Sequence, residues 1–335
     1  MPTSGHGRSA MRSLSGTSLV AVTLLVLSAL VVSTAACGKV GELRGRKAFR
    51  EANQAYTQQD YKKAAELYEV TVDADPELEH GEPYFFLGNS YDNQFKPSRK
   101  GEPANDALLE KAIKNYQLAS EKLAKSDKPD DKVLGRRSLE FLVNAYGPEK
   151  MNDPAKAEPV VQRMIQIEPG EPGNYFALAK IYEDAGAYEN AEQMLISAKN
   201  AKPSDPAVYM TLAGYYNRQG QFDKTINALV ERAAKEPNNP EAFQTIATFY
   251  WDEAFRDARL KESEKKDYVL KGIEAVDSAL KIKPDYMDAL VYKGLLLRLQ
   301  ANLEKDASKQ QALIKEATVL RDKAEDLKKK KTAGL

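Results

Sequence analysis

The sequence has very few residues of the types that most often carry catalysis or bind metals. Its 335 residues include one cysteine and two histidines, and only His80 lies beyond the first 36 residues. A single cysteine excludes an internal disulfide and a zinc site built on thiolates. The motifs GxxxxGK followed by Ser or Thr, GxGxxG after a strand, HExxH and GxSxG are also missing. We therefore expect no catalytic residues, no metal site and no cofactor, and predict that the protein is not an enzyme.

Two remaining groups of acid–base residues have simpler explanations. His80 lies in the segment ELEHGEP, where we expect a solvated loop residue. Asp252, Glu253 and Asp257 place carboxylates near one helical face, beside two arginines. A surface charge network accounts for such a group without an active site.

The chain also lacks an excess of charge of either sign. Its 49 basic and 49 acidic residues cancel. Without residues 1–36, which contain Arg8 and Arg12 but no acid, 47 basic and 49 acidic residues remain, a net charge of −2. This balance does not indicate a nucleic-acid partner, and the composition does not indicate an oligomeric state.

A long apolar run is missing as well. Leu19–Val32 is apolar over 14 residues, which is short for a spanning helix of about 20. It follows Arg8 and Arg12 and precedes small residues that end at Ala36. This order is typical of a signal peptide, predicted over residues 1–36. A plain signal peptide containing a cysteine, or an uncleaved anchor, is the alternative.

The residues Ala35-Ala36-Cys37 resemble the lipobox of bacterial lipoproteins, although Thr34 departs from the usual leucine. The resemblance implies cleavage before Cys37, lipidation of its sulfur, and fatty acyl chains such as palmitate that insert into the membrane. Residues 37–44 would then be a lipid-anchored tether. The protein would be exported and membrane-anchored on the periplasmic side. Gly38 in place of aspartate favours the outer membrane over the inner one.

The middle of the chain repeats itself with a period of 34 residues. Pro172–Asp205 and Pro206–Asn239 follow each other without an insertion. Matching residue classes recur at matching positions, as in the pairs Tyr175 and Tyr209, Leu178 and Leu212, Ala179 and Ala213, Tyr182 and Tyr216, Gly186 and Gly220, and Pro203 and Pro237. A fixed period of this length predicts a stacked array of helix pairs.

The repeated pattern resembles the tetratricopeptide repeat (TPR) family of helix–turn–helix units. The resemblance implies an all-α, right-handed α-solenoid of about seven TPR-like helix pairs with a C-terminal capping helix. The array covers residues 45–331. Its repeats are predicted at residues 45–78, 81–127, 133–170, 172–205, 206–239, 240–284 and 286–331.

Two insertions interrupt the period. Residues 92–105 contain two prolines and a glycine, which predicts a loop protruding between two helices. Residues 251–267 are charged and contain neither proline nor glycine, which predicts extensions of two helices. At the C-terminus, Ala312–Lys331 is predicted to form a long charged helix that covers the last apolar face. Its final four lysines are interpreted as a solvated end, with contact to anionic lipid or polymer as the alternative.

In the TPR family, positions 2, 5, 9, 12 and 13 of each repeat line the concave groove. This implies a partner-binding groove whose aromatic and methionine anchors lie beside amides and cations. The predicted residues are Phe85, Asn89, Asn144, Phe176, Lys180, Met210, Asn217, Arg218 and Trp251. Core packing is the alternative for Phe85, Phe176 and Trp251, and asparagine at position 9 is frequent in the family. The residues that clamp a C-terminal carboxylate in some family members are not matched.

These features together predict a membrane-tethered TPR scaffold or adaptor that mediates protein–protein interaction in the bacterial cell envelope. Its partner would be another envelope protein or a peptide segment, and its membrane contact would run through the lipid on Cys37. The alternative is a glycan- or small-molecule-binding component of an envelope enzyme or transport complex. The departures from the regular period are the places where we expect features particular to this protein.

Overall fold

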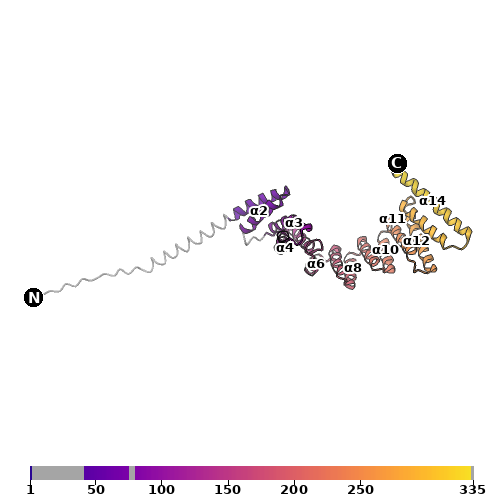
Figure 1. Ribbon diagram of the computed structural model, residues 1–335, viewed down its shortest axis with the longest axis horizontal. Coiled ribbons are helices and arrows are strands. Elements are labelled where there is room, and N and C mark those ends of the chain that lie inside the picture. The colour runs from indigo at the N-terminus through magenta and orange to yellow at the C-terminus, as the bar shows by residue number, and fades with distance from the viewer. Residues whose placement is uncertain (2–40, 75–79, 333–335) are drawn as a thin grey trace. The chain divides into compact units, whose positions relative to one another are not determined.

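The structure is a computed structural model that describes Met1, residues 41–74 and residues 80–332. The predicted signal peptide, the apolar run and Cys37 lie outside the described residues. These described residues contain helices and no strand, as Figure 1 shows. They divide into two compact units at residues 160 and 161. The prediction of an all-α array of TPR-like helix pairs is confirmed.

The N-terminal unit contains the first helix pairs and half of a helix that continues into the next unit. Residues 41–57 are helical, and this helical stretch includes residues 41–44 of the predicted tether. The remaining elements are α2 (Tyr61–Ala74), α3 (Glu82–Gln94), the 3-10 helix η1 (Pro97–Arg99), α4 (Pro103–Leu123), α5 (Pro129–Tyr146) and α6 (Pro154–Ile167).

The C-terminal unit continues with pairs of adjacent helices, α7 with α8, α9 with α10, α11 with α12 and α13 with α14. Their bounds are α7 (Pro172–Asp184), α8 (Tyr188–Ala201), α9 (Pro206–Arg218), α10 (Phe222–Lys235), α11 (Pro240–Arg256), α12 (Glu262–Ile282), α13 (Met287–Asn302) and α14 (Ala307–Thr332).

The first helix of each regular pair begins with the same local signal. Proline opens α7, α9 and α11, where its missing N–H has no helical partner to lose. The residue before it caps the helix: Asp205 Oδ1 accepts a bond from Ala207 N at 3.0 Å, and Asn239 Oδ1 accepts one from Glu241 N at 3.0 Å. Glu171 does the same for α7. These caps satisfy backbone donors that the helix leaves open.

The turns within the two regular repeats need glycine. Gly186 and Gly220 have φ values of +74° and +66°. This left-handed region is unfavourable for residues with a side chain. The requirement explains why the two glycines recur 34 residues apart.

Small and large residues alternate in the core of the C-terminal unit. Ala179 and Ala213 are 4% and 1% exposed, and they let neighbouring helices approach closely. Large side chains such as Leu195, Leu212 and Leu229 fill the space around them. The pattern of small and large positions seen in the sequence is therefore a packing pattern.

The first insertion is a shorter loop than the sequence predicted. α3 continues to Gln94 and α4 starts at Pro103, so the connection covers residues 95–102 and includes η1. Asn105 holds this loop, because its side chain accepts a bond from Lys96 N at 2.9 Å and donates to the carbonyls of Lys96 and Arg99 at 3.1 Å. The prediction of a protruding loop over residues 92–105 was wrong at both ends.

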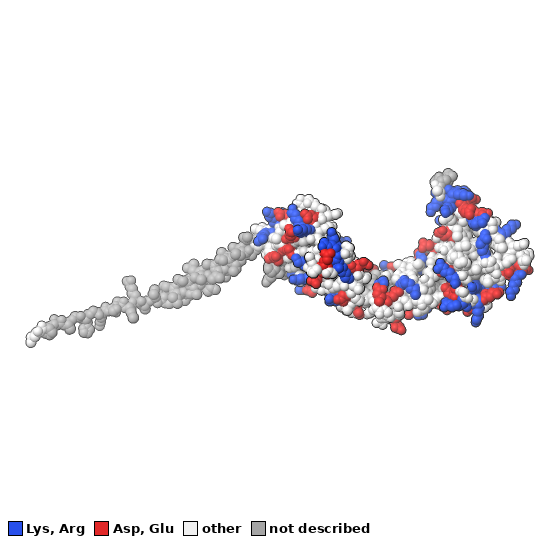
Figure 2. Space-filling view, in the orientation of Figure 1, with Lys and Arg blue, Asp and Glu red and all other residues white. Residues whose placement is uncertain are grey.

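The second insertion extends two helices, as predicted. α11 has 17 residues and α12 has 21, against 13 in α9 and 14 in α10. Beyond them α14 packs along α13 and buries Ala317 and Ala324 on that side. Three lysines lie in its last turn, and Figure 2 shows basic side chains gathered near its end.

Candidate partner-binding surface

Two asparagines at position 9 of their repeats hold helix pairs together. The Tyr68 hydroxyl of α2 donates to Asn53 Oδ1 at 2.6 Å. In the next pair, Asn89 Nδ2 of α3 donates to the Tyr116 hydroxyl of α4 at 3.3 Å. Asn89 also accepts a 2.6 Å bond from Tyr56 and is 6% exposed. These side chains satisfy one another inside the fold, so the predicted groove residue Asn89 has a structural role.

Phe85 is also a core residue. It is 4% exposed, and its ring centroid lies 5.2 Å from Phe86, 6.1 Å from Tyr116 and 5.7 Å from Phe141. Edge and tilted contacts of this kind stabilise a core beyond the area they bury. Phe85 therefore does not present a binding surface, contrary to its prediction as a groove residue.

Asn144 differs from the other two asparagines. Its repeat has Val161 where the first two repeats have Tyr68 and Tyr116, so the tyrosine partner is missing. The Asn144 side chain is exposed and makes no hydrogen bond with any residue that the structure describes. Among the predicted groove residues of the N-terminal unit, it alone keeps free donors and acceptors at the surface.

The two predicted cations of the C-terminal unit already have partners. Arg218 of α9 donates Nε and Nη2 to the two carboxylate oxygens of Glu183 at the end of α7, at 2.8 and 2.9 Å. This bidentate bond holds the pKa of Glu183 below its usual value. Lys180 forms an ion pair with Asp184 one turn away. Both cations thus reinforce α7 and α9, while the neighbouring Asn217 is exposed.

The predicted groove residues Phe176 and Met210 are only partly exposed to solvent. Phe176 of α7 is partly buried against the core cluster of α7 to α11. Met210 of α9 is 36% exposed, and its sulfur accepts a 3.0 Å bond from Arg232 Nη1. Arg232, itself 8% exposed, also bonds Glu236 at 2.8 Å and Glu241 at 3.3 Å, so it joins α9, α10 and α11.

An exposed aromatic group lies where α11 meets α13. The Trp251 ring stacks on Phe255 with ring centroids 5.1 Å apart and planes at 9°, and it forms a T-shaped pair with Tyr292 of α13, with centroids 5.9 Å apart and planes at 80°. Phe255 is 61% exposed. Trp251 is partly buried and packs against the core of α11 to α13. We call Trp251, Phe255 and Tyr292 the α11–α13 aromatic face.

The α11–α13 aromatic face continues along one side of α11. Gln244, Thr248, Trp251 and Phe255 are spaced by four, three and four residues, which places them on one helix face. Gln244 Nε2 donates to Thr248 Oγ1 at 2.8 Å. Rigid aromatic anchors beside polar groups are the composition of protein-binding hot spots.

Sequence reasoning found Trp251 but missed Phe255 and Tyr292. Phe255 belongs to the extra turn of α11, beyond the length of α7 and α9. Its spacing of four from Trp251, inside a predicted helical extension, was the signal that could have identified it. Tyr292 comes from the next repeat and is adjacent only in the folded chain.

The carboxylates near this face form ion pairs. Asp252 bonds Arg256 at 2.7 Å and Asp257 bonds Arg259 at 2.8 Å. Burial raises the pKa of Glu253, and the nearby carboxylate of Asp257 raises it further. In the described part of the chain no group of His, Cys, Asp and Glu could hold a metal ion. The same part contains no helix long and apolar enough to cross a membrane.

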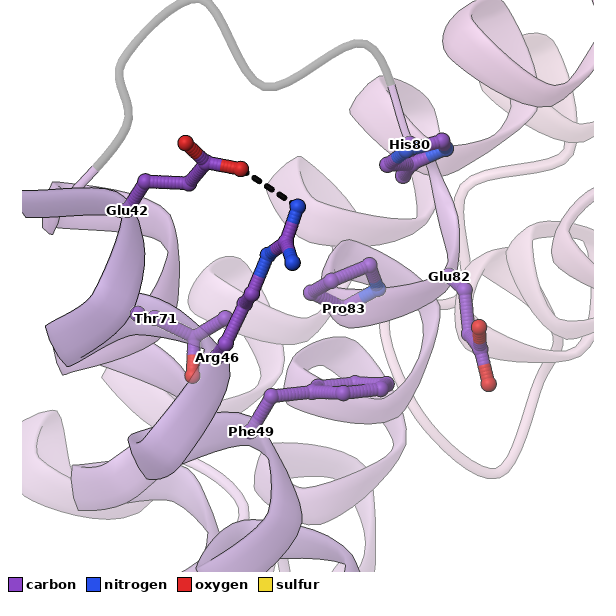
Figure 3. A pocket seen from close by; sticks show the side chains of 8 residues that line it. Glu42, Arg46, Phe49, Thr71, His80, Glu82 and Pro83 are labelled. Atoms are coloured by element: carbon purple, nitrogen blue, oxygen red, sulfur yellow. Dashed lines mark hydrogen bonds and ion pairs between the residues drawn. The ribbon is translucent and has the colours of Figure 1, made fainter. Parts of the chain in front are cut away.

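A small cavity lies between the helix over residues 41–57, α2 and the start of α3 (Figure 3). It measures about 220 Å³. Arg46 lies across its opening and bonds Glu42, above Phe49 and beside Pro83. Burial raises the pKa of Glu82 at its rim. His80, exposed as predicted, lines this cavity and a second one beside α4 that contains Lys122, Lys125 and Lys128.

A match to a family model supports the repeat assignment in the middle of the chain. The tetratricopeptide repeat family matches residues 150–215. A crystal structure of MamA is 20% identical, with 55% of this chain and 93% of that chain covered and a TM-score of 0.37. The C-terminal part of a TPR repeat-containing protein from Cytophaga hutchinsonii is 17% identical, with 83% and 98% covered and a TM-score of 0.48. MamA from Desulfovibrio magneticus RS-1 is 13% identical, with 58% and 95% covered and a TM-score of 0.38. No curated protein matches.

Proposed function

We propose that this protein is a membrane-tethered TPR scaffold that binds a protein partner in the bacterial cell envelope. The α11–α13 aromatic face is the observation that carries the proposal. Phe255 leaves 61% of its surface in water and stacks on the Trp251 ring, so the two form a continuous aromatic surface. Burying such a residue against a partner releases water from apolar surface at little cost in side-chain entropy.

The same face indicates what the partner presents. Trp251 is fixed on one side by the core of α11 to α13, so its exposed side is already oriented before binding. Preorganised aromatic anchors lose little freedom on association. Gln244 and Thr248 on the same helix face supply polar groups beside the anchors. An amphipathic helix or extended segment with apolar side chains at its centre fits this surface.

The test is capture of partners from detergent-solubilised envelope with the wild-type protein and with a Trp251→Ala/Phe255→Ala variant. We expect the variant to lose a partner that the wild type retains. With that partner purified, Kd should rise by a factor of about 30 or more, the scale of a hot-spot residue. A matched control is Val230→Ala/Leu270→Ala, which truncates side chains 50% and 46% exposed on α10 and α12.

Equal binding by the wild type and the Trp251→Ala/Phe255→Ala variant would remove this face from the proposal. Binding of cell-wall glycans, with no protein partner retained, would instead support the alternative of a glycan-binding component. The variant would lose glycan binding as well in that case, because the exposed aromatic rings are the same.

A further inference from the structure

The first helix of the described chain carries an unusual concentration of positive charge. Residues 41–50 contain four cations and one anion, Glu42, a net charge of +3. The chain from Cys37 onward has a net charge of −2. Two other basic groups are offset by acids or lie far away in the sequence. Lys122, Lys125 and Lys128 alternate with acids near the α4–α5 turn, and the final four lysines lie at the opposite end of the sequence.

The cations of this helix form one exposed face. Leu43, Lys47 and Arg50 are separated by four and three residues and therefore share a side of the helix, with Arg44 beside them. Leu43 is 68% exposed, although it is apolar. Arg44 and Arg50 make no ion pair or hydrogen bond with any described residue, and Lys47 approaches Glu51 only to 3.8 Å. We call Leu43, Arg44, Lys47 and Arg50 the basic face.

Arg46 does not belong to the basic face. It points across the cavity of Figure 3 and pairs with Glu42. Glu42, the single anion of residues 41–50, is therefore already paired with a cation of the same helix. Arg44 and Arg50 of the basic face therefore keep their charge uncompensated, whereas Lys47 pairs with Glu51.

The position of the basic face in the chain limits what it can meet. Gly41 lies four positions after Cys37, a distance of at most about 14 Å when the chain is fully extended. A lipid on Cys37 therefore keeps Gly41 within about one to two Debye lengths of the headgroups. Such a short link gives the surrounding lipid a far higher effective concentration than any soluble partner.

We propose that the basic face lies on anionic phospholipid headgroups, with Leu43 entering the boundary with the acyl chains. The inference rests on the proposed lipid anchor at Cys37. Basic residues near an anionic surface attract it electrostatically, and an exposed apolar residue among them adds burial. The contact fixes the orientation of the N-terminal unit on the membrane, which an acyl chain on a short linker cannot do alone.

The test uses the full lipid-anchored protein, purified in detergent from membranes of a bacterial host. It is reconstituted on vesicles of phosphatidylcholine with or without phosphatidylglycerol. Leu43→Cys provides the free thiol for an environment-sensitive fluorophore, because the Cys37 thiol carries the lipid. Val230→Cys, at a position 50% exposed in the C-terminal unit, is the matched control.

We expect a blue shift, and quenching by nitroxide-labelled lipid, at position 43 on vesicles that contain phosphatidylglycerol. Both signals should be lost at high salt and after Arg44→Gln/Lys47→Gln/Arg50→Gln. They should persist after Lys328→Gln/Lys329→Gln/Lys330→Gln, which removes the same charge at the other end of the chain. The control position should not respond.

The outcomes separate this inference from the anchor on which it rests. A protein that does not sediment with either vesicle overturns the anchor and the basic-face contact together. If the protein sediments but the fluorescence at position 43 does not change with phosphatidylglycerol, only the basic-face contact is overturned. That result would assign the basic face to an acidic protein instead. Loss of the signal in the Lys328→Gln/Lys329→Gln/Lys330→Gln variant would also contradict the proposal.

Discussion

At the scale of single residues, the N-terminal unit depends on a largely buried ion pair. Lys150 in the α5–α6 turn reaches Asp92 of α3 at 2.5 Å, and their side chains are 16% and 6% exposed. The Tyr116 hydroxyl donates to the same carboxylate at 3.3 Å. The pair thus ties a turn of one repeat to the first helix of the previous one.

Lys150→Met should lower the free energy of unfolding by about 3–5 kcal/mol, because it leaves the Asp92 carboxylate buried without its cation. Urea unfolding followed by circular dichroism measures the change. Lys111→Met is the matched control, since Lys111 and Glu69 form a pair at 3.3 Å whose side chains are 54% and 44% exposed. It should cost no more than about 1 kcal/mol. Equal losses in the two variants would show that burial does not set the cost.

The roles of single groove residues were only partly predictable. Asparagine at position 9 occurs with tyrosine at position 24 in the first two repeats and without it in the third, where Val161 stands. That co-occurrence marks Asn53 and Asn89 as bonded residues and leaves Asn144 exposed. It could have been read from the sequence once the repeats were aligned.

The different fates of Phe85 and Phe176 could not be predicted in this way. Both occupy position 5 of a repeat, but the residue that covers them comes from the repeat that follows. Phe141 covers Phe85, whereas Thr211 occupies the equivalent position after Phe176. The burial of position 5 therefore depends on the size of a residue in the next repeat, which the repeat period alone does not predict.

At the scale of helices, the close approach of α3 and α4 depends on Gly88. A Cβ at that position would lie 3.0 Å from the Tyr116 ring and 3.1 Å from the Ala112 carbonyl oxygen. Neither atom can move away easily, because Tyr116 is fully buried and Ala112 O is backbone. Glycine here is a packing requirement of the helix pair.

Gly88→Ala should therefore destabilise the protein by about 1–3 kcal/mol through overpacking. Gly214→Ala should instead stabilise the protein. Its nearest neighbour would be Arg218 Nη1 at an ordinary 3.5 Å, so the gain in helix propensity of about 0.5–1 kcal/mol is retained. Chemical unfolding of both variants measures the two changes in the free energy of unfolding. Destabilisation by Gly214→Ala as well would mean that glycine is needed in both helices for another reason.

Most helices could be predicted from the sequence, because their start signals are local. Proline and a capping side chain mark α7, α9 and α11, and the absence of proline and glycine correctly predicted the long α11 and α12. The loop after α3 was predicted too long. Its prolines, Pro97 and Pro103, open η1 and α4 instead of keeping the segment irregular. Proline at a helix start and proline in a loop look alike in a sequence.

At the scale of the whole molecule, the proposed lipid anchor at Cys37 would decide where the array is held. Cys37→Ser removes the sulfur to which a lipid would be attached and leaves every described residue unchanged. We expect the variant to move from the membrane to the soluble fraction, because it lacks the acyl chains that would hold the wild type in the bilayer. Fractionation of cells followed by immunoblotting measures the change. A variant that stays in membranes would indicate that Leu19–Val32 itself is the anchor.

The helix starts described above also affect how such a chain can change its length. Pro172, Pro206 and Pro240 recur every 34 residues, each directly after its own capping residue. A tandem duplication of 34 codons would therefore copy a complete start signal together with the helices it governs. The copied segment could fold without new mutations at its junctions, since the residues on both sides would match those already in place. Gain or loss of whole repeats is thus an accessible genetic change in this part of the gene, whereas the longer helices α11 and α12 have no such interchangeable neighbour.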